Sequence, residues 1–280
     1  MRRLRPLLLF APLLVLGVSL SACEPGKPKT PLSYTADAKR AYEFALDSFN
    51  SHSYIESQVL FREVRRKYSY SKYARLAELR IADADFLLDK FPDAIREYRQ
   101  FVHDHRSDAE EVSYARSRIA DAQYAQVTDS LFLASGEERD QGVIVDTYKE
   151  LRGFVHDYPN AKESVRMKKL LAELTGRLVK HELYVARYYL EKNNFDAAIL
   201  RIQYALRNYA RGGAVAAPSG EDDDLGLEPE ALLLMGETYL KMHKYTDARD
   251  AFFAIQHHYP ASAFVVPAQH YLDYMHTQGV

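Results

Sequence analysis

Tryptophan is absent from this chain of 280 residues, and cysteine occurs once, at Cys23. A single cysteine leaves no partner for a disulfide within the chain and no set of thiolates for a zinc site. Glycine and proline are also few, at 12 and 11 residues, and they cluster in a few places. A chain that is 47% apolar and sparing in both residues is typical of a mostly helical protein with an ample core.

Recognisable catalytic motifs are missing as well. The sequence has no phosphate-binding loop, nucleophile elbow or zinc-ligand spacing. The adjacent His257 and His258 would point about 100° apart on a helix and could not chelate one ion together. Asp222, Asp223 and Asp224 lack the spaced ligands of a calcium loop. We therefore expect no catalytic residue, no cofactor and no metal, and a protein that is not an enzyme.

The clearest positive signal is a helical hairpin at residues 181–210. Apolar residues recur there at helical spacing on both sides of a polar turn, Lys192 to Asn194. Small residues, Ala186 and Ala198, stand where the two helices must cross closely. A hairpin of this length cannot bury its apolar faces alone, so the pattern predicts further hairpins packed beside it.

Degenerate copies of the same pattern follow the tetratricopeptide template of L-G-x-x-Y, A-x-x-x-F and P. The last copy is the best, with Leu232, Met235, Gly236, Tyr239, Ala248, Phe252 and Pro260. Weaker copies contain Ala45 and Phe61, Ala82 and Ala94, Ala120 and Thr147, and Ala186 and Ala198. We predict an all-α fold, a tetratricopeptide-repeat superhelix of about five helix-turn-helix repeats. This repeat is a general binding scaffold, so the fold alone says little about function.

The spacing also predicts how the repeats are divided along the chain. Residues 36–160 would form repeats 1–3, with an acidic insertion inside the third. Residues 161–280 would form a long linking helix, from Ala161 to about Lys192, followed by repeats 4 and 5. Between these last two repeats, residues 211–229 contain glycine, proline and three aspartates, which indicates a mobile loop.

The first 22 residues have the pattern of a secretory signal. Arg2, Arg3 and Arg5 precede a short apolar run, Leu7 to Leu20, which is too short for a membrane span. The sequence Leu-Ser-Ala-Cys at 20–23 is similar to the bacterial lipobox, so we expect Cys23 to be the first mature residue and to carry the lipid. The alternative is an ordinary signal peptide with an unpaired thiol.

Residues 23–35 are rich in proline and would form an extended tether. Glu24 stands where an aspartate would resemble an inner-membrane retention signal, which favours the periplasmic face of the outer membrane. Removal of the three arginines leaves 34 basic and 39 acidic residues, a formal charge of −5. This balance argues against nucleic acid as a partner.

Aromatic and basic side chains gather in the first two repeats. The helices there carry apolar residues at positions that line the concave groove in this repeat class: Tyr42, Leu46, Phe49, Leu79 and Phe86. Between these helices Arg62 and Arg66 are interleaved with tyrosines, and we expect one of the two near an end of the client-peptide groove. Three interpretations of this basic stretch stay open: a solvated helix end, a site for a peptide carboxylate or acidic client, and contact with anionic lipid head groups.

The helix from Phe195 to Asn208 offers a second candidate surface. Its core direction is set by Phe195, Ala198, Ile202 and Leu206, which places a different set outward: Leu200, Tyr204 and Arg207, with Arg201 on the flank. Tyrosine and arginine are enriched at the centre of protein interfaces. Either a partner or the same chain would cover this face.

Together, the lipobox, the proline-rich tether, the five degenerate repeats and the hairpin beginning Tyr184-Val185-Ala186-Arg187-Tyr188-Tyr189 resemble the BamD family. These are the lipoproteins of the outer-membrane β-barrel assembly machine. The segment FVHDYPNA at 154–161 is similar as well. The chain departs from the family at residues 106 and 210, which lack the proline that ends a repeat, and in its longer 211–229 loop.

The resemblance implies a non-enzymatic scaffold that is lipid-anchored to the outer membrane. In the family, the C-terminal half binds the POTRA domains of the barrel protein BamA, with a contact at the arginine matching Arg201. The N-terminal half is thought to receive the C-terminal signal of unfolded outer-membrane clients, and other lipoproteins of the machine are further partners. The alternative function is a repeat lipoprotein of another envelope assembly, such as a pilotin or a peptidoglycan-machinery adaptor.

Overall fold

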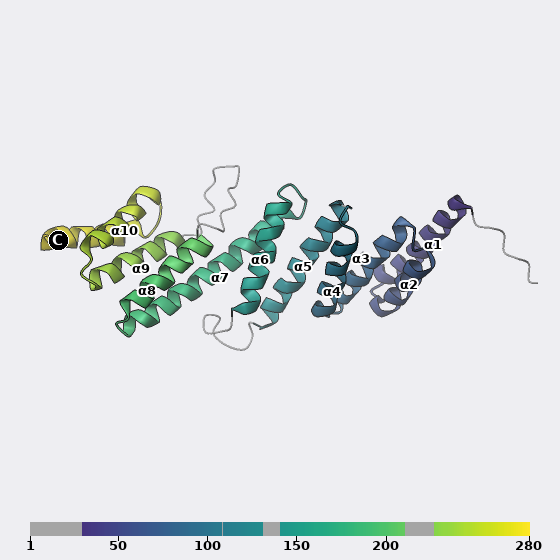
Figure 1. The fold of residues 1–280 in the computed structure, drawn as a ribbon, viewed down its shortest axis with the longest axis horizontal. Helices are drawn as coiled ribbons and strands as arrows, with labels where there is room; N and C mark the ends of the chain where they lie inside the picture. Colours follow the sequence, from purple (N-terminus) through teal and green to yellow (C-terminus); the bar gives the residue numbers. More distant parts are fainter. Residues whose placement is uncertain (1–29, 108, 131–140, 211–226) are drawn as a thin grey trace, which may run out of the picture.

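The computed structural model describes residues 30–107, 109–130, 141–210 and 227–280, and the regular elements in these ranges are all helices. They follow one another as antiparallel pairs along the long axis of the molecule, with α1 at one end and the C-terminus at the other (Figure 1). The pairs are α1 Pro31–Asn50 with α2 Tyr54–Lys67, α3 Lys72–Leu87 with α4 Phe91–Asp104, α5 Ala109–Ser130 with α6 Gly142–Asp157, α7 Ser164–Glu191 with α8 Phe195–Ala205, and α9 Leu227–Lys241 with α10 Tyr245–His258. A last helix, α11 Val265–Gln278, packs on α10. The predicted all-α superhelix of tetratricopeptide repeats is confirmed.

The same tight turn joins the two helices in four of the pairs. One residue in each turn has a positive φ of 56–60°: His52, Asp89, Asn193 and His243. Asparagine, aspartate and histidine tolerate this left-handed conformation better than most residues. Two positions later an aromatic residue begins the second helix: Tyr54, Phe91, Phe195 and Tyr245. The hairpins are therefore copies of one unit, although their sequences have diverged.

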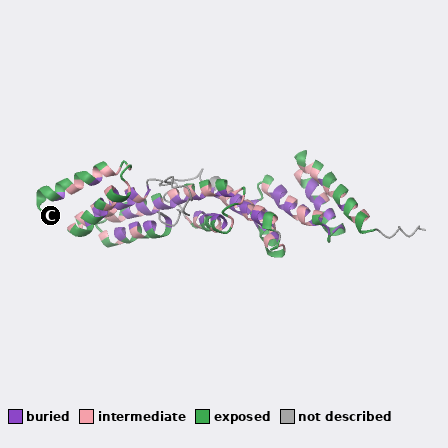
Figure 2. Cartoon of the chain, turned by 90° about the horizontal axis from the view of Figure 1, so that it is seen from above, coloured by how far each residue is buried: buried purple, intermediate pink, exposed green. Residues whose placement is uncertain are grey.

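The small residues at the recurring spacing of the repeat pattern are buried in the structure. Ala45, Ala82, Ala94, Ala186 and Ala198 are buried, because they stand where paired helices approach most closely. Figure 2 shows buried residues on the inner sides of the helices and a largely exposed α11 at the C-terminal end. In α11 the buried residues are Ala268 and Met275, as expected for a terminal helix with one packed face.

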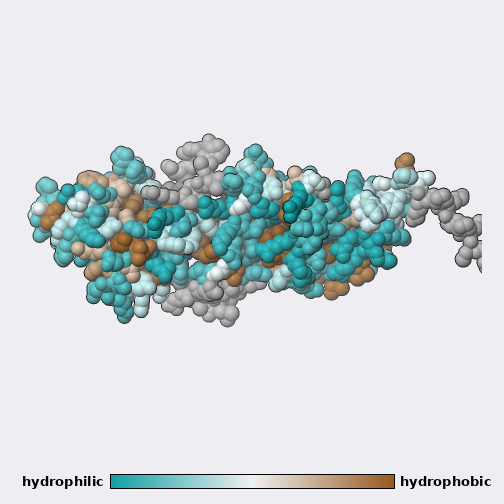
Figure 3. All heavy atoms as spheres, in the orientation of Figure 1, coloured by the Kyte–Doolittle hydropathy of each residue, from teal (hydrophilic) through white to brown (hydrophobic). Residues whose placement is uncertain are grey.

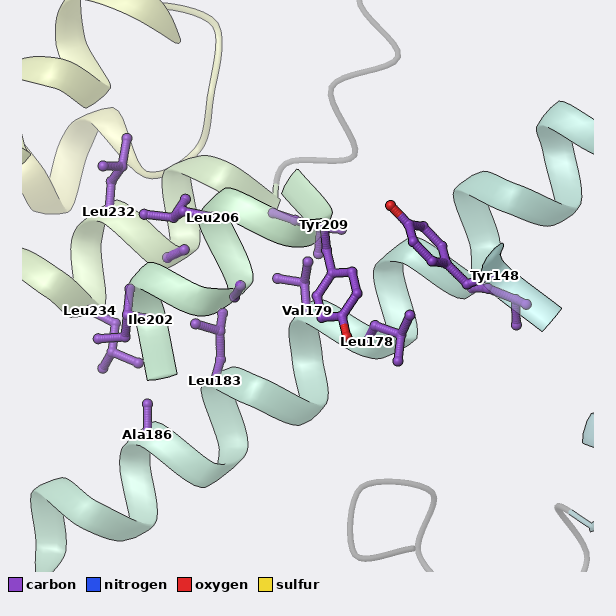
Figure 4. Close-up of a cluster of buried hydrophobic side chains, with 14 of the residues drawn as sticks. Tyr148, Leu178, Val179, Leu183, Ala186, Ile202, Leu206, Tyr209, Leu232 and Leu234 are labelled. Atoms are coloured by element: carbon purple, nitrogen blue, oxygen red, sulfur yellow. The ribbon is translucent and has the colours of Figure 1, made fainter. Parts of the chain in front are cut away.

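The apolar core is divided unevenly. One cluster runs from α5 to α11. In the close-up of Figure 4, Ile202 of α8 lies beside Leu234 of α9, and Leu178 of α7 lies beside Tyr209 and Tyr148. The N-terminal half has two smaller clusters, one shared by α1, α2 and α3 and one by α3, α4 and α5. After Ala205 the chain continues as a π-helical turn, Leu206–Ala210, which sets the Tyr209 ring 5.4 Å from that of Tyr148.

Two boundaries differ from the predicted ones. The tether was expected to extend to residue 35, but α1 already begins at Pro31, because the Thr30 hydroxyl caps the helix and proline is favoured in its first turn. The loop from residue 211 was expected to extend to residue 229, with the last repeat after it, but α9 already begins at Leu227. The signal peptide, Cys23 and residues 211–226 lie outside the described residues. Within the described ranges, no helix combines the length and the apolar composition needed to span a membrane.

Candidate binding surfaces

A ladder of alternating charges crosses the first helices of repeats 2, 3 and 4. Asp83 lies between Arg80, at 2.9 Å, and Arg118, at 3.7 Å. Asp121 continues the series, with Arg118 at 3.2 Å and Arg166 of α7 at 2.9 Å. We call these five residues the ion ladder. Its two carboxylates are almost fully buried, so the alternation of sign is what makes their burial tolerable.

Two tyrosines complete the environment of Asp83. The Tyr98 hydroxyl, from α4, and the Tyr114 hydroxyl, from α5, both donate to Asp83 Oδ1, the second at 2.8 Å. Burial, followed by the negative charge of Asp83, raises the pKa of Tyr98 well above its usual value and that of Tyr114 to about 12. Both hydroxyls therefore stay protonated at neutral pH and hold α3, α4 and α5 around one carboxylate.

Sequence reasoning missed this ladder, although the sequence contains a signal for it. The tetrapeptide Arg-Ile-Ala-Asp occurs twice, at 80–83 and at 118–121. In both copies the alanine is the buried alanine of the repeat, so the arginine and the aspartate occupy equivalent positions on α3 and α5. The repetition predicts a series of like sites along the superhelix, but not the tyrosines that satisfy them.

The predicted groove residues are for the most part half-buried, and two of them, Tyr42 and Phe86, lie near arginines of this ladder. Tyr42 packs between Phe61 and Tyr73, with ring centroids 5.5 and 5.7 Å away. The Arg118 guanidinium stacks 3.9 Å from the Phe86 ring. Leu46 and Phe49 pack against the first core cluster with part of their surface exposed.

Leu79 does not fit the groove assignment. It is 3% exposed and belongs to the core between α3, α4 and α5. The neighbouring position, Arg80, is the one on the accessible side of α3. A step of one residue turns a helix by about 100°, which is enough to exchange core for surface.

Arg62 and Arg66 are exposed and lie on α2, whereas the groove candidates lie on α1 and α3. The buried side of α2 is formed by Ser57, Phe61 and Val64. Spacings of four, three and four residues align Ile55, Val59, Arg62 and Arg66 on the opposite side. The arginines that the structure sets beside the groove aromatics are Arg80 and Arg118.

The outward face of α8 is open in the described part of the chain. Leu200 is 61% exposed and Tyr204 43%, while Ala198 and Ile202 are fully buried. Arg207 is exposed and donates to the Gln203 carbonyl at 3.3 Å. The described residues of α7 leave this face uncovered.

Arg201 is not a free surface charge. Its guanidinium bonds the carboxylate of Glu182 at 3.2 Å, and that carboxylate is 8% exposed. Arg201 therefore joins α8 to α7 and neutralises a nearly buried anion. A charge reversal at Arg201 would set two carboxylates against each other and lower the stability of the hairpin.

The face shown in Figure 3 is mostly hydrophilic, with separate hydrophobic patches scattered along its length. No group of three or more potential metal ligands comes together within the ranges that the structure describes. A shallow hollow of about 600 Å³ lies along α10, between Asp250 and His258. The helical surfaces above are thus the better defined places for contact with other molecules.

These observations define a helical repeat scaffold with partly exposed aromatic and charged side chains in its N-terminal half and an open, tyrosine-bearing outward face in its fourth repeat. The chain belongs to a family described as "YfiO: Outer membrane lipoprotein", whose model matches residues 35–217.

Full-length relatives agree with this membership. The chain is 25% identical to the outer membrane protein assembly factor BamD of Neisseria meningitidis serogroup A, over 90% of the chain and 92% of that relative. It is 23% identical to BamD of Caulobacter vibrioides, over 96% of the chain and 81% of that relative. Among solved structures, a thermophilic TPR protein of Thermus thermophilus aligns at 15% identity with a TM-score of 0.34, covering 84% of this chain and 98% of that one.

Proposed function

We propose that the protein is a non-enzymatic scaffold of the machine that assembles β-barrel proteins in the outer membrane, and that the outward face of α8 binds the POTRA domains of the barrel component. The observation that carries this proposal is the exposure of Leu200 and Tyr204 on α8 and of Arg207 in the π-helical turn that follows it. Interface centres favour tyrosine, arginine and large apolar residues of this kind. The names of the relatives, outer membrane protein assembly factors, support a place in this machinery. The POTRA domains as partner are what the family resemblance implies.

The test is capture of the barrel protein from detergent-solubilised membranes by the tagged, full-length chain. Tyr204→Ala and Arg207→Glu should each weaken capture by about fivefold to tenfold. The midpoint of thermal unfolding should stay near that of the parent for Arg207→Glu, whereas Tyr204→Ala also loses a ring contact with Tyr209, whose centroid is 5.7 Å away. Phe253→Ala is the matched control, because it removes another half-exposed aromatic side chain from a second helix, α10. Undiminished capture by the α8 variants, or equal loss with Phe253→Ala, would overturn the assignment.

The same experiment separates the two functions that the sequence left open. If a secretin or a component of the peptidoglycan machinery is captured in place of a barrel protein with POTRA domains, the protein serves another envelope assembly. Arg201→Glu is unsuitable here, because its effect on the bond to Glu182 would obscure any effect on binding.

A second contact rests on the N-terminal groove. Tyr42, Phe49 and Phe86 offer partly exposed rings. Arg118 stacks on Phe86. Arg80 lies close enough to Tyr42 for its charge to act on that hydroxyl, and neither guanidinium group is fully buried. The ion ladder carries three arginines and two aspartates, so one positive charge is left over. An extended client segment that ends in a carboxylate matches this combination of rings and cations.

Photocrosslinking tests the groove. A benzoylphenylalanine at Tyr42 or Phe86 should capture a peptide with the C-terminal sequence of an outer-membrane barrel protein. The substitution replaces one aromatic side chain with another, so the local packing should be kept. The control position is Arg96, which is exposed on the outer side of α4. Equal capture from Arg96 would show that the peptide does not prefer the groove. Loss of capture on amidating the peptide would identify the carboxylate as the group recognised.

A further inference from the structure

One face of α2 combines apolar and cationic side chains in a way that neither the core nor the groove uses. Ile55 is 68% exposed and Val59 56%, and Arg62 and Arg66 continue the same line toward the end of the helix. The line is about 17 Å long at 1.5 Å per residue. We call these four residues the α2 stripe. The two β-branched side chains lie one turn apart, so contact of this face with an apolar layer would remove both from water together.

The equivalent positions of other repeats are different. Ser57, Ala94 and Ala248 are the matching buried residues of α2, α4 and α10, and they set the alignment. The stripe positions then hold Pro92, Arg96, Arg99 and His103 in α4, and Thr246, Asp250, Phe253 and His257 in α10. Neither helix places two aliphatic residues before two arginines, so the α2 stripe is not a general requirement of the repeat.

Positive charge is concentrated at the C-terminal end of the stripe. Arg62, Arg65, Arg66 and Lys67 stand in the last turns of α2 with a single acid, Glu63. Glu63 lies 3.5 Å from Arg66, but both side chains are mostly exposed, so this pair is weak in water. The end of the helix dipole favours cations here, but it does not require four of them or account for Ile55 and Val59.

The structure sets this basic end beside the point where the N-terminal segment enters the fold. The Tyr34 ring, one turn into α1, lies 5.4 Å from the ring of Tyr68, which follows Lys67. Cys23 precedes Thr30 by seven residues, which can span at most about 23 Å. Leu32 and Tyr70, at the same end, are also strongly exposed. A lipid attached at Cys23 would hold the stripe within reach of the membrane surface.

We propose that the α2 stripe docks on the anionic phospholipid surface in which the lipid of Cys23 is embedded. The proposal rests on the proposed function at the outer membrane, together with the lipid attachment that the sequence predicts at Cys23. Ile55 and Val59 would enter the boundary between head groups and acyl chains, and Arg62 and Arg66 would meet lipid phosphates. A lipid anchor alone leaves the superhelix free to rotate. Contact through α2 would add a second point of attachment and fix which way the groove and the α8 face point.

We favour a membrane over another protein as the occupant, because the cationic end of the stripe lies at the same end of the molecule as the segment that leads to Cys23. Each arginine close to an anionic membrane surface raises the partition coefficient of a protein onto that membrane by about fivefold. The neighbouring Arg65 and Lys67 would add to this attraction without forming any specific pair. An acidic protein could also match the charges, and the experiment is designed to reveal it.

The test uses the acylated full-length protein in lipid vesicles. Cys23 is the sole cysteine and would be blocked at its sulfur by the lipid, so Val59→Cys introduces one free thiol for an environment-sensitive NBD dye. In vesicles with about 30% phosphatidylglycerol, the emission should shift to the blue and be quenched by spin-labelled lipid, since charge attraction strengthens interfacial binding. Arg96→Cys, at the equivalent position of α4, is the control and should report water. Vesicles without anionic lipid should give a smaller shift.

Reversal of the charges provides the second arm. Arg62→Glu with Arg66→Glu, on the Val59→Cys background, should lower the ratio of docked to undocked protein by at least about 25-fold. Salt at about 0.5 M should lower it in the parent as well. A water-like signal from position 59 in anionic vesicles would overturn the proposal. So would a shift that appears only after other envelope proteins are added, which would identify the stripe as a protein interface.

Capture of the barrel protein by the same labelled variants separates this inference from the proposed function. Retained capture with a water-like signal at position 59 contradicts membrane docking alone. Lost capture with a lipid-like signal contradicts the α8 assignment alone. Release of the protein from vesicles after a salt wash would contradict both the lipid attachment and the docking that depends on it.

Discussion

The two halves of the superhelix are stabilised in different ways. From α5 to α11 one continuous apolar cluster links the helices, with Leu178, Ile202 and Phe252 among its buried members. From α1 to α5 the apolar residues form two smaller clusters, and between them Asp83 is enclosed by arginines and tyrosines. Apolar packing is non-directional, whereas a buried carboxylate requires its partners at set positions.

This contrast matches the roles that we propose for the halves. The C-terminal half presents the α8 face on a rigid apolar support, which suits one fixed partner. The N-terminal half leaves rings and guanidinium groups partly exposed beside its polar network, which suits segments that vary from client to client. The predictions below test the contrast, beginning with the substitution of largest expected effect.

Phe252→Ala tests the apolar half. The Phe252 ring is fully buried, stacked on Tyr271 with centroids 5.0 Å apart. Its removal should lower the free energy of unfolding by about 4 kcal/mol, because the surrounding helices cannot close the cavity fully. Hydrogen exchange should rise first in α9, α10 and α11. Phe253→Ala, at the next and half-exposed position, should change stability by no more than about 0.5 kcal/mol. Similar losses for the two variants would contradict the structure.

Asp83→Asn tests the polar half. The substitution keeps the shape of the side chain and removes the charge that Arg80 and Arg118 share, which should cost about 3 kcal/mol. Hydrogen exchange should rise in α3, α4 and α5 while α9 and α10 stay protected. Asp93→Asn, in an exposed pair with Arg96, is the control and should cost less than about 0.5 kcal/mol. If protection is lost equally along the chain, the halves do not unfold separately.

Gly236→Ala tests how tightly the apolar half is packed. A Cβ at Gly236 would lie 2.4 Å from the Phe252 ring, so the ring would have to move and stability should fall by about 2 kcal/mol. Gly176→Ala provides the opposite case in α7. The nearest atom to its Cβ would be Leu227 Cδ1, at an ordinary 3.7 Å, so the gain in helix propensity should stabilise the protein by up to about 1 kcal/mol. Denaturant titrations would show two changes of opposite sign.

Hairpins and their apolar faces were predictable from the sequence because they depend on local spacing. Ala186 and Ala198 were expected at the close crossing of α7 and α8, and both are fully buried. Leu200 and Tyr204 were expected to face outward, and both are exposed. In these cases the periodicity of one helix contains the information that decides burial.

Contacts between distant segments were beyond the same reasoning. The helical periodicity around Leu79 did not separate the core from the groove, because the two directions are a single residue apart. The pattern of α8 showed Arg201 on a flank, but its partner Glu182 lies on another helix. For Asp83 the repeated tetrapeptide indicates position, whereas the two tyrosine hydroxyls that bond it come from α4 and α5.

Tyr114→Phe should have the smallest effect of the series at neutral pH, about 1 kcal/mol for one lost hydrogen bond. Its effect should depend on pH. Burial and the charge of Asp83 raise the pKa of Tyr114 to about 12, compared with 10 in the unfolded chain. Above pH 10 the unfolded state releases a proton that the folded state retains, so this contribution is full below pH 10 and is lost as the pH rises toward 12.

The difference in unfolding free energy between parent and Tyr114→Phe should therefore shrink from pH 9 to pH 12, measured by urea titration in steps of pH. Tyr271 in the apolar half is a suitable comparison, because burial and its hydrogen bond to Glu237 likewise raise its pKa to about 12. Tyr271→Phe should show the same alkaline trend, but with hydrogen exchange changing in α9, α10 and α11 and not around Asp83. A constant difference across this range for Tyr114→Phe would mean that its hydroxyl does not bond the buried carboxylate in solution.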